Sequence, residues 1–217
     1  RRTGICALFY GGPGVGKTET IRQIAKATGR DIFMVDMALK SKWIGESEKN
    51  LKQVFKTYKR LVRECDAAPI LLFNEADAIF GKRVVEENSA EKLNNALQNI
   101  ILQEMEDLEG ILIATTNMTE SLDPAFERRF LYKVLFKKPT TGVKAKIWKS
   151  MIDDITDSDA ESLAAEYSFT GGQIENITRK LDVDYILFGT SPDMDKIHNL
   201  CKSEGIRKEN VRKTIGF

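Results

Sequence analysis

Short apolar runs alternate with longer stretches of helical periodicity through the first two thirds of the chain. The runs predict strands at residues 5–10, 32–35, 70–73, 111–114 and 132–136, the first nearly continuous as in a strand covered on both faces. Between them, apolar residues recur at i, i+3, i+4 and i+7 and predict helices near 17–28, 47–62 and 93–108, the last closed by Gly110. Because strand and helix alternate, we predict an α/β fold with a parallel sheet covered by helices on both faces.

The pattern changes at Pro139. From Thr141 onward only helical periodicity remains, with breaks near Asp157, Gly171 and Ser191. We therefore predict two domains, an α/β domain over 1–138 and a smaller domain of about four helices over 139–217.

Composition narrows the class of protein. The 217 residues are 42% hydrophobic and 30% charged, and 33 basic residues nearly cancel 32 acidic ones. A net charge of +1 gives no overall case for nucleic acid or an anionic membrane as partner. No apolar run approaches the roughly 20 residues that span a bilayer. The chain opens at Arg1 without a methionine and reaches a strand almost at once, so we expect it to be part of a longer protein.

Cysteine and histidine usage bounds the chemistry. The three cysteines, at 6, 65 and 201, are widely spaced and form no C-x-x-C pair, and there is one histidine. Neither a disulfide framework nor a zinc site is indicated. Free thiols favour a reducing, cytoplasmic setting.

The strongest chemical signal is the segment Gly11–Thr18, which fits the pattern G-x-x-x-x-G-K-T between a strand and a helix. Such a loop directs backbone N–H groups and a helix N-terminus at phosphates, while Lys17 adds a charge and Thr18 reaches Mg²⁺. A glycine turn that binds nothing is the alternative, and the flanking strand and helix count against it. The predicted ATP-binding residues are Gly12, Pro13, Gly14, Val15, Gly16, Lys17, Thr18 and Glu19.

The strand 70–73 runs into Asn74 and Glu75. An aspartate usually holds the magnesium shell at such a strand end, and the glutamate after it aligns the attacking water. Here Asn74 keeps a carbonyl acceptor for a metal-bound water or for Thr18, but it lacks the charge. Asn117 ends another strand and is a candidate to contact the terminal phosphate or the water. We predict retained ATP binding, reduced Mg²⁺ affinity and slow but measurable turnover.

Together these motifs resemble the AAA module of the AAA+ ATPase superfamily over essentially the whole chain. Gly11–Thr18 resembles the Walker A motif, Ile70–Glu75 the Walker B motif, and Asn117 the sensor 1 position. The resemblance implies a P-loop domain followed by a helical lid. Residues 122–130 resemble the second region of homology, which implies that Arg128 and Arg129 act as arginine fingers on a neighbouring subunit. From the residues alone, a surface arginine pair is the better interpretation.

Two further segments resemble parts of this family. Residues 42–48 resemble the first pore loop of protein-remodelling members, which implies that Trp43 and Ile44 grip a polypeptide threaded through a hexameric ring. The alternative is a hydrophobic staple ahead of a helix capped by Ser47. Residues 169–177 resemble the lid segment that faces adenine, which implies a nucleotide contact at Gly172.

The leading hypothesis is an ATP-driven protein remodeller that forms a homo-oligomeric ring. A nucleotide-gated binding or scaffold module with little hydrolysis is the second. A DNA-associated loader is disfavoured by the neutral charge and by the absence of a DNA-reading motif.

Overall fold

The computed structural model describes residues 4–36, 47–81, 89–117, 122–189 and 193–206. The chain divides into two compact units. The first comprises Arg1–Gly12 with Gly16–Phe136, and the second comprises Pro13–Val15 with Lys137–Phe217.

The first unit is built on a parallel sheet. Among the described residues its five strands are β1 (Ile5–Tyr10), β2 (Ile32–Asp36), β3 (Ile70–Asn74), β4 (Ile111–Thr116) and β5 (Tyr132–Leu135). Their order is β2-β3-β4-β1-β5, with every pair parallel. The first four residues of β3 are all buried, as a strand covered on both faces requires. The predicted α/β parallel sheet is confirmed.

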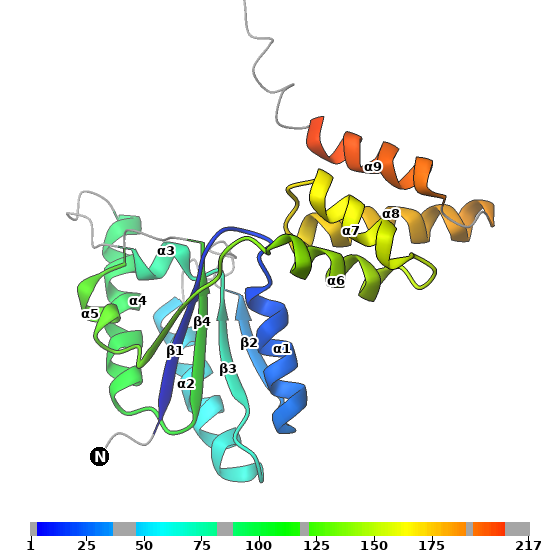
Figure 1. The fold of residues 1–217 in the computed structure, drawn as a ribbon. Coiled ribbons are helices and arrows are strands. Elements are labelled where there is room, and N and C mark those ends of the chain that lie inside the picture. The colour runs from blue at the N-terminus through cyan, green and yellow to red at the C-terminus, as the bar shows by residue number, and fades with distance from the viewer. Residues whose placement is uncertain (1–3, 37–46, 82–88, 118–121, 190–192, 207–217) are drawn as a thin grey trace, which may run out of the picture. The chain divides into compact units, whose positions relative to one another are not determined.

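Helices cover both faces of this sheet (Figure 1). The unit's described helices are α1 (Lys17–Thr28), α2 (Ser47–Glu64), α3 (Asp77–Phe80), α4 (Ser89–Glu106) and α5 (Pro124–Glu127). On one face, Ile21 and Ala25 of α1 pack with apolar residues of β1, β3 and β4. On the other, residues of α2 and α4 pack against β3 and β4. Ile24 of α1 is 37% exposed, so it lies at the edge of this apolar face.

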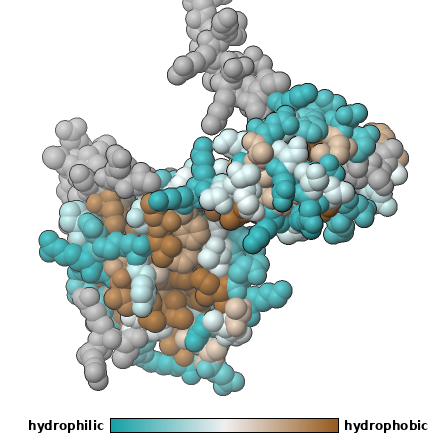
Figure 2. Space-filling view, viewed as in Figure 1, coloured by the Kyte–Doolittle hydropathy of each residue, from teal (hydrophilic) through white to brown (hydrophobic). Residues whose placement is uncertain are grey.

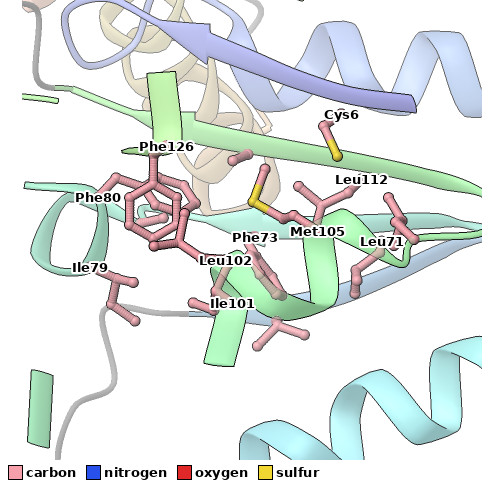
Figure 3. Close-up of a cluster of buried hydrophobic side chains, with 14 of the residues drawn as sticks. Cys6, Leu71, Phe73, Ile79, Phe80, Ile101, Leu102, Met105, Leu112 and Phe126 are labelled. Carbon is pink, nitrogen blue, oxygen red and sulfur yellow. The ribbon is translucent and has the colours of Figure 1, made fainter. Parts of the chain in front are cut away.

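The larger of the two cores is rich in aromatic side chains (Figure 3). The ring of Phe80 lies 4.7 Å from that of Phe126 and 5.5 Å from that of Phe130, centroid to centroid. Leu108 also belongs to this core, at 3% exposure. The prediction that Leu108 lies in the long helix was wrong, because α4 ends at Glu106. Leu108 lies in the connection after α4, and its side chain packs into this core.

The second unit is helical. Its described helices are four: α6 (Thr141–Met151), α7 (Asp157–Glu166), α8 (Gly171–Phe188) and α9 (Met194–Ile206). They surround a core that includes Trp148, Leu163 and Ile174, each 0% exposed. A reciprocal capping box starts α8, in which the Thr170 hydroxyl accepts from the Gln173 N–H and the Gln173 side chain accepts from the Thr170 N–H.

Apolar side chains also reach the surface over the strands of the first unit (Figure 2). Its exposed apolar residues include Leu131, Tyr132 and Leu135, at 66%, 56% and 46%. Within the described parts of the chain, no helix is both long and apolar enough to cross a membrane.

Candidate functional site

The loop between β1 and α1 has a backbone that suits phosphate. Gly11, Gly14 and Gly16 have φ angles of 142°, 71° and 97°, a region that L side chains rarely adopt. Gly16 caps α1 without a side-chain hydrogen bond, so the first N–H groups of the helix are not covered by a capping side chain. A Cβ added at Gly12 or Gly16 would meet no described atom within 4 Å. The space beside Gly12 and Gly16 is thus open at the N-terminus of α1, where the free backbone N–H groups of a helix favour an anion.

Lys17 brings a positive charge to this loop. The residue is 8% exposed, and its ammonium donates to Gly11 O at 2.7 Å, Gly12 O at 2.8 Å and Asn117 Oδ1 at 2.9 Å. Burial lowers the pKa of Lys17 below its ordinary value, while the carboxylates of Asp77 and Glu75 oppose that shift. The ammonium thus joins the loop to the end of β4.

Asn74, the last residue of β3, faces α1. Its Oδ1 accepts a hydrogen bond from the Thr18 hydroxyl at 3.1 Å and another from the Thr115 hydroxyl at 3.1 Å. The bond between Thr18 and the amide oxygen, considered possible from the sequence, is present. Hydroxyl and amide oxygens are ligands that Mg²⁺ accepts, directly or through water, when nucleotide phosphates complete its shell. Thr18 and Asn74 fit that role, with one negative charge fewer than an aspartate would supply.

Glu75 follows directly and is exposed. Its φ angle is 53°, the one positive φ of a non-glycine residue in the described chain. The Glu75 N–H donates to the Thr115 hydroxyl at 3.0 Å, and the next N–H, of Ala76, donates to Thr115 O at 2.9 Å. A left-handed backbone outside glycine is held only where its surroundings impose it. Here Thr115 holds the turn that presents the carboxylate.

Asp77, at the start of α3, was not among the predicted site residues. Its carboxylate accepts from the Thr116 hydroxyl, from the Asn117 N–H at 2.7 Å and from Asn117 Nδ2 at 3.2 Å. These bonds orient the Asn117 side chain with its oxygen toward Lys17. The signal available in the sequence was the position of Asp77, three residues past the end of β3. Its counterparts are the hydroxyl and amide side chains of Thr116 and Asn117 at the end of β4.

The two predicted arginine fingers differ in their surroundings. Arg129 forms an ion pair with Glu106 and donates to Ala125 O at 2.9 Å. Arg128 is exposed, and no side-chain hydrogen bond or ion pair to another described residue is found for it, while its N–H donates to Pro124 O at 3.3 Å. Of the two arginines, Arg128 is the one whose side chain is exposed and without a described partner.

Gly172 and Glu19 were also predicted contacts, and two further predicted residues lie outside the described part of the chain. Gly172 belongs to the second unit, where its N–H donates to Gly14 O at 3.0 Å. The Glu19 side chain, on α1, accepts from Gln23 at 2.6 Å. Their roles at a nucleotide stay predictions. Trp43 and Ile44 lie outside the described residues.

The family model described as "ATPase family associated with various cellular activities (AAA)" matches residues 7–138, more than half of the chain. The chain belongs to the AAA family of ATPases. The predicted membership is thus confirmed, and the chain is an ATP-binding AAA module whose matched span contains the glycine loop, Asn74, Glu75, Asn117 and both arginines.

Three relatives illustrate the similarity. The module is 28% identical to "ATPase family gene 2 protein homolog B" of Bos taurus, over 96% of this chain and 29% of that protein. It is 29% identical to "Fidgetin-like protein 1" of Drosophila melanogaster, over 68% of this chain and 28% of that protein. It is 27% identical to "Protein SUPPRESSOR OF K(+) TRANSPORT GROWTH DEFECT 1" of Arabidopsis thaliana, over 89% and 47%. The chain thus spans less than a third of the first two relatives.

Proposed function

We propose that this AAA module hydrolyses ATP slowly with Mg²⁺ as cofactor. The observation that carries the proposal is the pair at the end of β3. Asn74 retains its acceptor bond to Thr18, and Glu75 presents an exposed carboxylate one residue further on. Bound ATP supplies the phosphoryl group, and Glu75 orients and deprotonates the attacking water. Because Asn74 is neutral, the site attracts Mg²⁺ less strongly than a carboxylate would.

Steady-state phosphate release by the native protein, Asn74→Asp and Glu75→Gln tests the proposal. Asn74→Asp should raise turnover and lower the Mg²⁺ concentration for half-maximal rate, because it restores a charge next to the cation. Glu75→Gln should lower turnover by about 10²–10⁴-fold, the usual contribution of a positioned general base, and leave ATP affinity near the native value.

Equal turnover in the native protein and in Glu75→Gln would rule out the hydrolase. That result would favour the second candidate, a nucleotide-gated scaffold, for which the neutral Asn74 is the supporting observation. Unchanged Mg²⁺ dependence in Asn74→Asp would instead show that this position does not act on the cation.

At the level of the whole protein, we propose a homo-oligomeric ring, a hexamer, that remodels a polypeptide threaded through its centre. Exposed Arg128 supports the ring, since an arginine finger must cross to a neighbouring site. The likeness of residues 42–48 to a pore loop supports a polypeptide substrate. Free thiols at Cys6, Cys65 and Cys201 support a cytoplasmic location, which cell fractionation tests.

A further inference from the structure

An asparagine and an aspartate at position 74 differ in more than charge. A carboxylate presents an acceptor oxygen whichever way it is turned about its last bond. An amide presents oxygen on one side and an NH₂ donor on the other. At Asn74 the orientation of the amide therefore decides whether Thr18 and a nearby cation meet an acceptor or a donor.

Thr115 is placed to decide this orientation. It lies in β4, next to β3 in the sheet, and is 1% exposed. Its hydroxyl lies 3.1 Å from Asn74 Oδ1 and 3.0 Å from the N–H of Glu75. The N–H of Glu75 is a donor, so the hydroxyl accepts from it and keeps its own proton for Asn74. With the amide reversed, that buried proton would face an NH₂ group and lose its acceptor.

Thr18, on α1, favours the same orientation of the Asn74 amide. Its hydroxyl also donates to Asn74 Oδ1 at 3.1 Å. Two hydroxyl donors thus converge on one amide oxygen, and both bonds require the same orientation. Thr18 is itself a predicted cation ligand, whereas Thr115 is buried behind Asn74, so Thr115 can be varied without removing a group from the cation.

We propose that Thr115 is a positioning residue of this site. Its hydroxyl holds the oxygen of Asn74 toward Thr18 and the cation, and it anchors the left-handed backbone of Glu75. The inference rests on the proposed function and deepens it. It also implies that the effect of losing the Thr115 hydroxyl differs between two backgrounds. With Asn74, the hydroxyl both orients the amide and anchors Glu75. With a carboxylate at position 74, which has two equivalent oxygens, the orienting effect disappears and only the anchoring of Glu75 remains.

A double-mutant cycle tests this difference. The four proteins are the native one, Thr115→Val, Asn74→Asp and the double variant, and the readout is binding of a fluorescent, non-hydrolysable ATP analogue at increasing Mg²⁺. In the native background, Thr115→Val should raise the Mg²⁺ concentration for half-maximal binding about tenfold, the effect of one net hydrogen bond. In the Asn74→Asp background the shift should be clearly smaller. Thr115→Ser, which keeps the hydroxyl, should bring the value back toward native.

Hydrogen exchange of the Glu75 amide, followed without nucleotide, reports the second contact. Exchange should become faster in Thr115→Val and not in Thr115→Ser. Thr115→Ala replaces Thr115→Val if the latter does not fold.

Equal Mg²⁺ shifts in both backgrounds, or no shift in the native one, would overturn the inference. So would ATP-analogue binding that does not depend on Mg²⁺ in the native protein. Failure of the hydrolase proposal gives a different result, since phosphate release would be absent while the difference in Mg²⁺ shift between the two backgrounds persisted.

Discussion

At the scale of single residues, the adjacent arginines Arg128 and Arg129 have different environments. Arg129 is held by Glu106 and by Ala125 O, and its side chain is 21% exposed. Arg128, one residue earlier, is exposed. An arginine already paired within its own subunit would have to break that pair before it could reach a neighbouring nucleotide. We therefore propose the trans role for Arg128 and a structural role for Arg129.

A mixing experiment tests this assignment. Arg128→Ala should lower ATP turnover by about 10³-fold or more, since arginine fingers contribute on that order. Arg129→Ala should mainly lower the free energy of unfolding, by about 1 kcal/mol for a partly exposed ion pair. Mixed with Glu75→Gln, Arg128→Ala should regain turnover, because an intact Arg128 then faces an intact Glu75 across the interface. Absence of regain in mixed oligomers would place the arginine in its own subunit's site or outside catalysis.

At the scale of elements, two single-turn helices connect the chemistry to the core. α3 begins at Asp77, two residues after Glu75, and α5 ends one residue before Arg128. Phe80 of α3 packs on Phe126 of α5, and the Asp123 N–H donates to Phe80 O at 2.9 Å. The segments that carry Glu75 and Arg128 are therefore supported by the same pair of packed rings, Phe80 and Phe126, which Figure 3 shows.

Removal of the Phe126 ring should destabilise the fold. Phe126 is 0% exposed, so Phe126→Ala should lower the free energy of unfolding by about 3–5 kcal/mol in urea denaturation followed by circular dichroism. Leu131→Ala is the matched control, because Leu131 is 66% exposed and should change stability by about 0.5 kcal/mol or less. A loss below about 1 kcal/mol for Phe126→Ala would mean that the surrounding residues close the cavity.

At the scale of the whole molecule, the chain consists of two units with separate hydrophobic cores. Its match to the bovine relative covers 29% of that protein's length. The proposed ring assembly and the proposed work on a polypeptide would involve several copies of the chain. The proposed pore role of Trp43 belongs to this scale, because a single aromatic side chain can grip a polypeptide only when a ring places several copies around a channel.

In the intact protein, Trp43→Ala should lower ATP-dependent unfolding of a fluorescent protein substrate far more than it lowers phosphate release. Trp43→Tyr should retain much of the unfolding, because it keeps an aromatic surface for the polypeptide. Loss of ATP binding in Trp43→Ala would contradict the pore role and indicate a staple that supports the helix beginning at Ser47.

The sequence by itself determined the local features of this protein. Strands and helices followed from apolar periodicity, and the glycine loop followed from residues that tolerate positive φ. The helices α3 and α5 were not predicted, because four residues make one turn and show no period. Glu75 was a candidate for water activation from its place after a strand, and the structure leaves its carboxylate exposed.

Only the tertiary structure decided which polar groups meet. The order β2-β3-β4-β1-β5 sets β3 beside β4, so Thr115 reaches Asn74 and Glu75 across 41 and 40 residues of sequence. The same adjacency brings Asp77 to Asn117, and packing against α4 pairs Arg129 with Glu106 while Arg128 stays exposed. Periodicity is a property of neighbours along the chain. Hydrogen bonds between strand ends depend on sheet order, and no local pattern encodes that order.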